Sequence, residues 1–202
     1  LMRKMLPLLQ QAGIDRVGGV IFASWPYDYN IPFDKPAAWA RSVESMREAA
    51  DIAADNGVTL LAEVVNRFEH YMVNTAAEAV QFVNDIGKKN VKVMLDTFHM
   101  NIEEDFLGDA IRTAGPLLGH LHIGECNRKV PVQGHMPWDD IGQGLRDIGY
   151  QGAVVMEPFV RMGGTVGREI KGWHDLSDGG DDAKLDADIA GALRFVKEKF
   201  VK

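Results

Sequence analysis

Short apolar runs alternate with longer amphipathic stretches along the chain. The apolar runs cover residues 17–23, 58–65, 91–97, 118–123 and 153–159. Most of these runs are nearly continuous in hydrophobic residues, which is typical of strands that are covered on both faces of a parallel sheet. The pattern therefore predicts five strands in one buried sheet.

The stretches between the apolar runs have helical spacing. Hydrophobic residues recur three or four positions apart at Trp39, Val43, Met46, Ala50 and Ala53, at Trp138, Ile141, Leu145 and Ile148, and at Leu185, Ile189, Leu193, Val196 and Phe200. Thr75 and Glu78 have the spacing of a capping box that opens another helix. A weaker stripe at Phe106, Ala110 and Ala114 predicts a helix between the third and fourth strands, and residues 1–11 resemble the end of a helix.

Alternation of strands and helices predicts an α/β fold with a parallel sheet and right-handed crossovers. Two architectures fit this order: an open doubly wound sheet, or part of a (β/α)8 TIM barrel. Five units are three fewer than a barrel needs, and the sequence begins inside a helix. We therefore expect residues 1–202 to form one barrel domain that covers about the last five β/α units and lacks the N-terminal ones.

Composition and charge narrow the class of protein. The 202 residues suit a single domain, and the net charge of −7 disfavours general binding to nucleic acid or to anionic membranes. No apolar run approaches the roughly 18 residues that suggest a membrane span. The single cysteine, Cys126, excludes an internal disulfide and predicts a reducing, cytoplasmic location.

A residue that can bind a metal lies near the end of each of the last four predicted strands. These residues are Glu63, Asp96, His122 and Glu157. The carboxyl ends of parallel strands lie at one face of the fold, where sites are built, so the four side chains could converge. Three carboxylates and one imidazole would form a mixed oxygen and nitrogen shell suited to Mn²⁺, Co²⁺ or Mg²⁺.

Each of these residues also has an ordinary structural interpretation. An isolated acid at a strand end more often caps a helix or contacts a loop amide, and His122 alone is more often a satisfied core histidine. Buried carboxylates, however, need a partner or a metal. Four ligand types on four successive strands therefore favour a metal site over four unrelated contacts.

A second group of polar residues follows the same strands. Glu69, His99 and Arg128 are good hydrogen-bonding partners for a polyhydroxylated ligand, and Trp25 could stack on a sugar ring. We expect His99 to lie in a loop after the third strand. Solvated loop charges remain the alternative for Glu69 and Arg128, and a core position remains the alternative for Trp25. The glycine-rich residues 163–167 lack a phosphate-binding pattern and predict a flexible loop.

Five stretches of the sequence resemble the ketose 3-epimerases, the family of D-tagatose 3-epimerase and D-psicose (D-allulose) 3-epimerase. These stretches are EVVNRFE, VKVMLDTFHMNIEED, GHLHIGECNR, MPWDDIGQGLRDIGYQG and VMEPFVRMGG. The resemblance runs from about residue 22 to the end of the chain. Several stretches are long, so the resemblance is more specific than a shared fold. The wider relatives are xylose-isomerase-like barrels.

The resemblance implies a (β/α)8 barrel with one divalent metal ion, usually Mn²⁺ or Co²⁺. It implies metal ligation by Glu63, Asp96, His122 and Glu157, with Glu63 and Glu157 also acting as the two catalytic acids and bases. It implies that Glu69, His99, Arg128 and Trp25 bind the substrate. The family's relatives form dimers or tetramers, so a homodimer or homotetramer is expected.

The implied reaction is metal-dependent epimerisation of free ketohexoses at C3, such as D-fructose with D-psicose or D-tagatose with D-sorbose. Two glutamates would remove and return the C3 proton through a cis-enediolate. Two alternatives stay open: a sugar or hydroxypyruvate isomerase of the same barrel class, and an inactive N-terminally truncated fragment. A nuclease-like metal enzyme is disfavoured by the acidic charge balance.

Overall fold

Five parallel strands form one sheet in which each strand pairs with the next one along the chain. In the computed structural model, which describes residues 1–201, the strands are β1 (Arg16–Gly19), β2 (Thr59–Glu63), β3 (Val91–Asp96), β4 (Leu118–Ile123) and β5 (Ala153–Met156). Their spatial order is β1-β2-β3-β4-β5. A doubly wound sheet reverses its strand order partway, whereas the wall of a barrel keeps sequence order. The topology therefore resolves the choice in favour of the barrel architecture.

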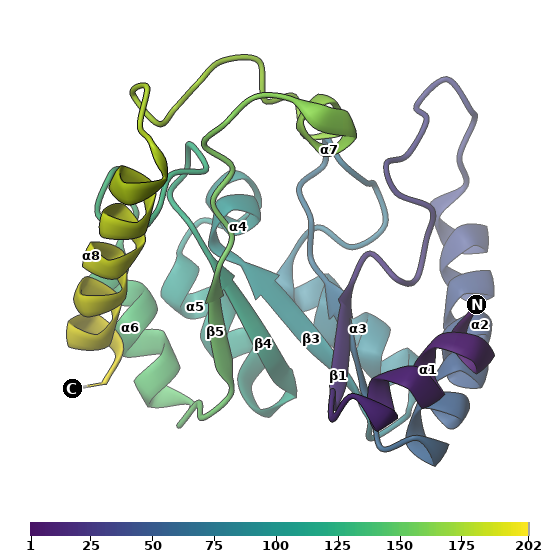
Figure 1. Ribbon diagram of the computed structural model, residues 1–202. Helices are drawn as coiled ribbons and strands as arrows, with labels where there is room; N and C mark the ends of the chain where they lie inside the picture. Colours follow the sequence, from purple (N-terminus) through teal and green to yellow (C-terminus); the bar gives the residue numbers. More distant parts are fainter. Residues whose placement is uncertain (202) are drawn as a thin grey trace.

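The helices are α1 (Met2–Gln11), α2 (Lys35–Asp55), α3 (Ala76–Ile86), α4 (Thr97–Glu103), α5 (Leu107–Ala114), α6 (Trp138–Asp147), α7 (Gly164–Glu169) and α8 (Asp182–Phe200), with a short 3-10 turn at Gly115–Leu117. Most of them form a row along the outer side of this sheet, whereas α7 lies above the C-terminal ends of the strands (Figure 1). Contacts run from α1 to α2, α2 to α3, α3 to α5, α5 to α6 and α6 to α8. Each strand and its following helix thus stack on the next pair.

The hydrophobic core lies between the sheet and this row of helices. Phe82 of α3, Met46 of α2 and Ile111 of α5 are fully or almost fully buried there, against Leu60 and Leu95 of the strands. Burying a large apolar side chain contributes about 1.5–3 kcal/mol to folding. The outer face of the sheet is thereby covered, and the inner face carries polar side chains together with apolar ones such as Leu61 and Met94.

The predicted capping box at the start of α3 is present in a modified form. The Thr75 hydroxyl accepts a hydrogen bond from the Glu78 backbone N–H at 3.2 Å. The Glu78 carboxylate reaches one residue further back than expected and accepts from the N–H of Asn74 at 2.8 Å. The first contact satisfies an N–H group that the first helical turn leaves without a partner, and the second ties the residue before the N-cap to the helix.

Several predicted boundaries were wrong. Strands β1 and β5 end before the limits of residues 23 and 159, so Glu157 directly follows a strand. His99 lies within α4 and not in a loop, and residues 164–167 begin the short helix α7. Phe106 precedes α5 and is 68% exposed, so it does not join the buried stripe.

Two residues of the predicted C-terminal stripe also differ from expectation. Ile189 and Leu193 of α8 are 44% and 45% exposed, while Ala192 and Val196 are buried. The covered face of α8 is therefore narrower than the spacing of its apolar residues suggested. Within residues 1–201, none of the helices combines the length and hydropathy needed to cross a membrane.

Candidate active site

The four expected metal ligands lie at the C-terminal ends of neighbouring strands. Glu63 is the last residue of β2, Asp96 is the last of β3, His122 is the penultimate residue of β4, and Glu157 follows β5. The strand register places Asp96 directly beside His122. Because side chains alternate between the two faces of a strand, this register directs the group to the inner face of the sheet.

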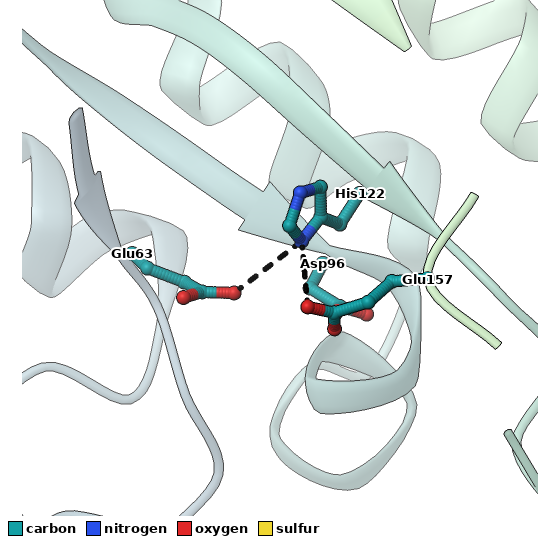
Figure 2. Close-up of side chains that lie close together, drawn as sticks. All are labelled: Glu63, Asp96, His122 and Glu157. Atoms are coloured by element: carbon teal, nitrogen blue, oxygen red, sulfur yellow. Dashed lines mark ion pairs between the residues drawn. The ribbon is translucent and has the colours of Figure 1, made fainter. Parts of the chain in front are cut away.

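These four side chains converge in the structure. One candidate ligand atom from each lies within 4.8 Å of all the others. Figure 2 shows Glu63 and Glu157 approaching the His122 ring from two sides, with Asp96 beside them. At that separation two carboxylates repel by more than about 3 kcal/mol at an effective dielectric constant of about 20. The carboxylates therefore need positive charge beside them, and a divalent cation bound among them would supply it.

The His122 ring supplies an independent test of this interpretation. Its Nδ1 atom is buried and has no hydrogen-bond partner, although Glu157 Oε1 lies 3.4 Å away and Glu63 Oε1 lies 3.7 Å away. Buried polar atoms are rarely left without a partner. Nitrogen and carboxylate donors that face one another in this way fit a divalent ion with a mixed oxygen and nitrogen shell.

The carboxylates also alter the protonation of the ring. Burial acts to lower the pKa of His122, but Glu157 and Glu63 outweigh burial and raise this pKa to about 10. A proton on the imidazole is therefore one way for the fold to balance the surrounding negative charge. A bound divalent cation would balance the same charge and displace that proton.

The pKa values of Asp96 and Glu157 shift in opposite directions. Burial raises the pKa of Asp96, although Arg128 acts to lower it. Burial also acts to raise the pKa of Glu157, but His122 and Arg128 outweigh it, and the net shift is downward. Asp96 is almost fully buried, whereas the Glu157 side chain is 31% exposed, which agrees with the greater burial effect on Asp96.

His99 is held in one tautomer by Asn66. The His99 Nδ1 atom accepts a hydrogen bond from the Asn66 backbone N–H at 3.1 Å, and Asn66 Nδ2 lies 2.8 Å away. Burial, followed by the charge of Arg128, lowers the pKa of His99 to about 3, so the ring is neutral near pH 7. Since Nδ1 is an acceptor, Nε2 carries the proton and can donate.

Glu69 lies beside this histidine and contacts the expected aromatic residue. Trp25 Nε1 donates to Glu69 Oε2 at 3.1 Å, and Arg128 approaches Glu69 Oε1 at 3.5 Å. Burial raises the pKa of Glu69, with Arg128 and Trp25 acting in the opposite direction. Trp25 thus orients Glu69 through its indole N–H, a contact that the sequence did not indicate.

Arg128 connects the two groups of residues. Its guanidinium lies 3.0 Å from Glu157 Oε2 and 3.3 Å from Asp96 Oδ2. The same group lies 3.7 Å from the centre of the Phe98 ring, within the range of a cation–π contact. Arg128 is buried, so the solvated-loop alternative for this residue was wrong.

A cavity of about 420 Å³ opens above these residues. Its polar wall includes Glu63, Glu69, His99, Arg128 and Glu157. Its apolar wall includes Trp25, Val65 and Phe159, with Val166 and Ile170 from α7 and the segment that follows it. Pockets that bind small molecules commonly measure about 300–1,000 Å³, so this cavity suits a ligand of monosaccharide size.

Three contributors to the site were not singled out from the sequence. Asn66 fixes the His99 tautomer, and Phe98 and Phe159 flank the Arg128 guanidinium. Asn66 lies within the EVVNRFE stretch, but its role depends on a contact with a residue 33 positions away. The phenylalanines follow Thr97 and Pro158 in the sequence and look like ordinary apolar positions. Their contacts with the Arg128 guanidinium could therefore be found only in the three-dimensional structure.

Comparisons with known proteins agree with this geometry. Residues 1–182 match the family model of the xylose isomerase-like TIM barrel. The chain is 61% identical over 182 residues to D-psicose 3-epimerase of Agrobacterium fabrum, covering 90% of this chain and 63% of that protein. It is 57% identical over 191 residues to D-psicose 3-epimerase of Ruminiclostridium cellulolyticum, covering 95% of this chain and 65% of that protein.

A solved structure is also very similar. The crystal structure of D-psicose 3-epimerase with D-tagatose from Clostridium cellulolyticum H10 superposes with a TM-score of 0.97 at 55% identity. That match covers 98% of this chain and 69% of the other. The chain therefore belongs to the xylose isomerase-like TIM-barrel family and, within it, to the ketose 3-epimerases. It spans less than two thirds of the length of the two D-psicose 3-epimerases compared by sequence.

Proposed function

We propose that the protein is an isomerase that epimerises free ketohexoses at C3 with the help of one divalent metal ion. The observation that carries this proposal is the placement of Glu63 and Glu157 on two sides of His122, at the wall of a cavity of monosaccharide size. The names of the relatives support a ketose as the substrate class. D-fructose with D-psicose, and D-tagatose with D-sorbose, are the proposed substrate pairs.

Epimerisation requires a base on each side of the carbon that changes configuration. The C3 proton of a ketose is weakly acidic because it is α to the C2 carbonyl, and inversion requires its removal from one face and return on the other. Glu63 and Glu157 come from different strands, and we assign one to removal and the other to return. A bound divalent ion would supply Lewis-acid polarisation of the sugar carbonyl.

The surrounding polar groups would orient the sugar between these two carboxylates. The neutral His99 ring would donate its Nε2 proton to a carbonyl or hydroxyl oxygen. Arg128 and Glu69 would hold further sugar oxygens, since guanidinium donates and carboxylate accepts hydrogen bonds. Trp25 would act by orienting Glu69 and by covering one side of the ligand.

The shell of Glu63, Asp96, His122 and Glu157 suits Mn²⁺ or Co²⁺, with Mg²⁺ as a further candidate. These metals share a tolerance for mixed carboxylate and imidazole ligands, and thiolate is absent from this shell. The homodimer or homotetramer and the cytoplasmic location stay predictions from the family resemblance and from cysteine usage.

Glu157→Gln tests the two-base assignment. The amide cannot take up a proton, so we expect epimerase turnover with D-fructose to fall by at least about 100-fold. The metal affinity should also weaken, because a charged ligand becomes neutral. Glu48→Gln is the control, since Glu48 is an exposed residue of α2 that pairs with Arg3 of α1. Full activity in Glu157→Gln would contradict the assignment, whereas loss of activity in Glu48→Gln would indicate a general effect.

A further inference from the structure

A fully buried carboxylate lies just outside the candidate active site. Glu125 follows β4 by two residues and has no exposed surface. Its Oε1 atom accepts hydrogen bonds from the Val132 backbone N–H at 2.9 Å and from Trp138 Nε1 at 2.9 Å. Its Oε2 atom accepts from the Met136 backbone N–H at 3.1 Å. One side chain thus fastens three points of the segment 130–138.

The loop closes tightly around this carboxylate. A Cβ atom at Gly134 would overlap Oε2 of Glu125, so no larger residue fits there without movement. Val132 has a φ of 92°, a region that β-branched residues rarely adopt. Such conformations cost about 1–3 kcal/mol and persist only where the surroundings hold them. The hydrogen bond from the Val132 N–H to Glu125 supplies part of that hold.

The same residue anchors the turn that carries Arg128. The Glu125 carbonyl accepts from the Arg128 N–H at 3.0 Å, and the Glu125 N–H donates to the Lys129 carbonyl at 2.9 Å. Arg128 itself has a φ of 64°. Its carbonyl accepts from the Phe159 N–H at 2.9 Å, which ties the turn to the segment after β5. The backbone position of Arg128 therefore depends on a turn that begins at Glu125.

We propose that Glu125 is a positioning residue that acts on the substrate through Arg128. Its carboxylate holds segment 130–138 against the turn, and the turn directs the guanidinium towards Glu69 and Glu157. This inference rests on the substrate-binding role proposed for Arg128. Glu125 is not one of the four candidate metal ligands and does not line the cavity, so its effect on substrate binding is indirect.

Glutamine at this position cannot reproduce the contacts. All three partners of Glu125 are N–H donors, and an ionised carboxylate is an acceptor at both oxygens. In Glu125→Gln the amide oxygen can replace only one of those oxygens. The amide NH₂ then faces an N–H group, which leaves a buried donor without a partner. The substitution thus loosens segment 130–138 with almost no change in side-chain volume.

The single cysteine allows the turn to be observed directly. Cys126 lies between Glu125 and Arg128, and its Sγ atom is 3.4 Å from Nδ1 of His135 in the same segment. The rate at which iodoacetamide alkylates this thiol therefore reports on the order of the turn. This measurement requires neither bound metal nor catalytic turnover.

The experiment compares Glu125→Gln with wild type and with Glu104→Gln. Glu104 follows α4 and also accepts a backbone N–H, that of Ala76 at the start of α3, so it fastens a different part of the chain from the turn of Arg128. We expect Glu125→Gln to raise the alkylation rate severalfold and the KM for D-fructose about tenfold, as for loss of about 1.4 kcal/mol of binding. The fall in kcat should be smaller, the Kd for Mn²⁺ should stay within about twofold of wild type, and Glu104→Gln should match wild type.

Each other outcome has a defined meaning. An unchanged alkylation rate in Glu125→Gln would overturn the proposal at the level of the turn. Faster alkylation with unchanged KM, or a loss of Mn²⁺ affinity as large as the change in KM, would show that Glu125 has only a structural role. Absence of epimerase activity in wild type would contradict the proposed function instead, and the alkylation comparison would still test whether Glu125 orders the turn.

Discussion

Asp96→Asn is the sharpest test of the proposed metal site formed by Glu63, Asp96, His122 and Glu157. Asp96 Oδ1 accepts the Phe98 N–H at 2.7 Å and caps α4, a role that an asparagine oxygen can also fill. The substitution therefore removes one negative charge from the cluster with little change in local structure. We expect wild type to be stabilised by Mn²⁺ and the variant to lose most of that stabilisation.

The expected size of the effect follows from linkage. A ligand at 100 times its Kd stabilises the folded state by about 2.7 kcal/mol. For a chain of this size that corresponds to a rise in Tm of about 5–11 °C. If Asp96→Asn weakens binding about 100-fold, the same Mn²⁺ concentration gives only about 0.4 kcal/mol, or a shift of about 1 °C.

The assay is calorimetric unfolding with and without Mn²⁺, after prior treatment with a chelator. Asp34→Asn is the matched control, because Asp34 caps α2 by accepting the Ala37 N–H and lies outside the cluster. This control should keep the full Mn²⁺-dependent shift. The account of the cluster would be refuted if wild type gave no shift with Mn²⁺, Co²⁺ or Mg²⁺, or if Asp96→Asn kept the wild-type shift.

Two further predictions concern stability. A Cβ at Gly144 of α6 would lie 2.8 Å from the Gly108 carbonyl oxygen. Gly144→Ala should therefore lower the free energy of unfolding, measured in urea, by about 1–3 kcal/mol. Gly191→Ala on α8 is the comparison and should raise the same free energy by about 0.5–1 kcal/mol. Burial, followed by Lys35, lowers the pKa of His70 below its unfolded value. The contribution of neutral His70 to stability is therefore present above about pH 6.5 and is lost as the pH falls. His70→Asn can still accept the Met72 N–H, so it should reduce the loss of unfolding free energy at acidic pH. An unchanged dependence of unfolding free energy on pH would contradict this assignment.

The strand ends carried most of what could be predicted about the site. Glu63 and Asp96 lie near the ends of apolar runs and are the last residues of β2 and β3, and parallel strands present such ends at one face. The approximate strand positions were therefore enough to predict that four side chains able to bind a metal would converge. Errors of a few residues in the predicted limits of β1 and β5 did not affect this prediction. The position of Glu157 depends on the strand that it follows and not on the residue at which that strand ends.

The local structure around His99 was harder to predict. We expected a loop after Asp96, but Asp96 is itself the N-cap of α4, so the chain turns into a helix at once. Aspartate is a favoured N-cap residue, and this signal was available in the sequence. The role of Asn66 could not have been found in this way, because it depends on a contact with His99, which lies 33 residues further along the chain.

Glu125 illustrates a second limit. Its sequence context, between a strand and a polar turn, is that of a solvated loop acid, and exposure is the usual state of glutamate. Its complete burial depends on three N–H donors that converge from residues 132, 136 and 138. Because loop conformation determines that convergence, neither apolar periodicity nor residue type predicts it.

The central claim is that Glu63 and Glu157 move a proton at C3 of a ketose. The most direct measurement is the reaction of D-fructose in D₂O with Mn²⁺, followed by NMR analysis of product and recovered substrate, and a parallel sample treated with a chelator. The account predicts D-psicose with deuterium at C3, and no product after chelation. An aldose product with deuterium at C2, and recovered D-fructose with deuterium only at C1, would contradict it and would indicate aldose–ketose isomerisation.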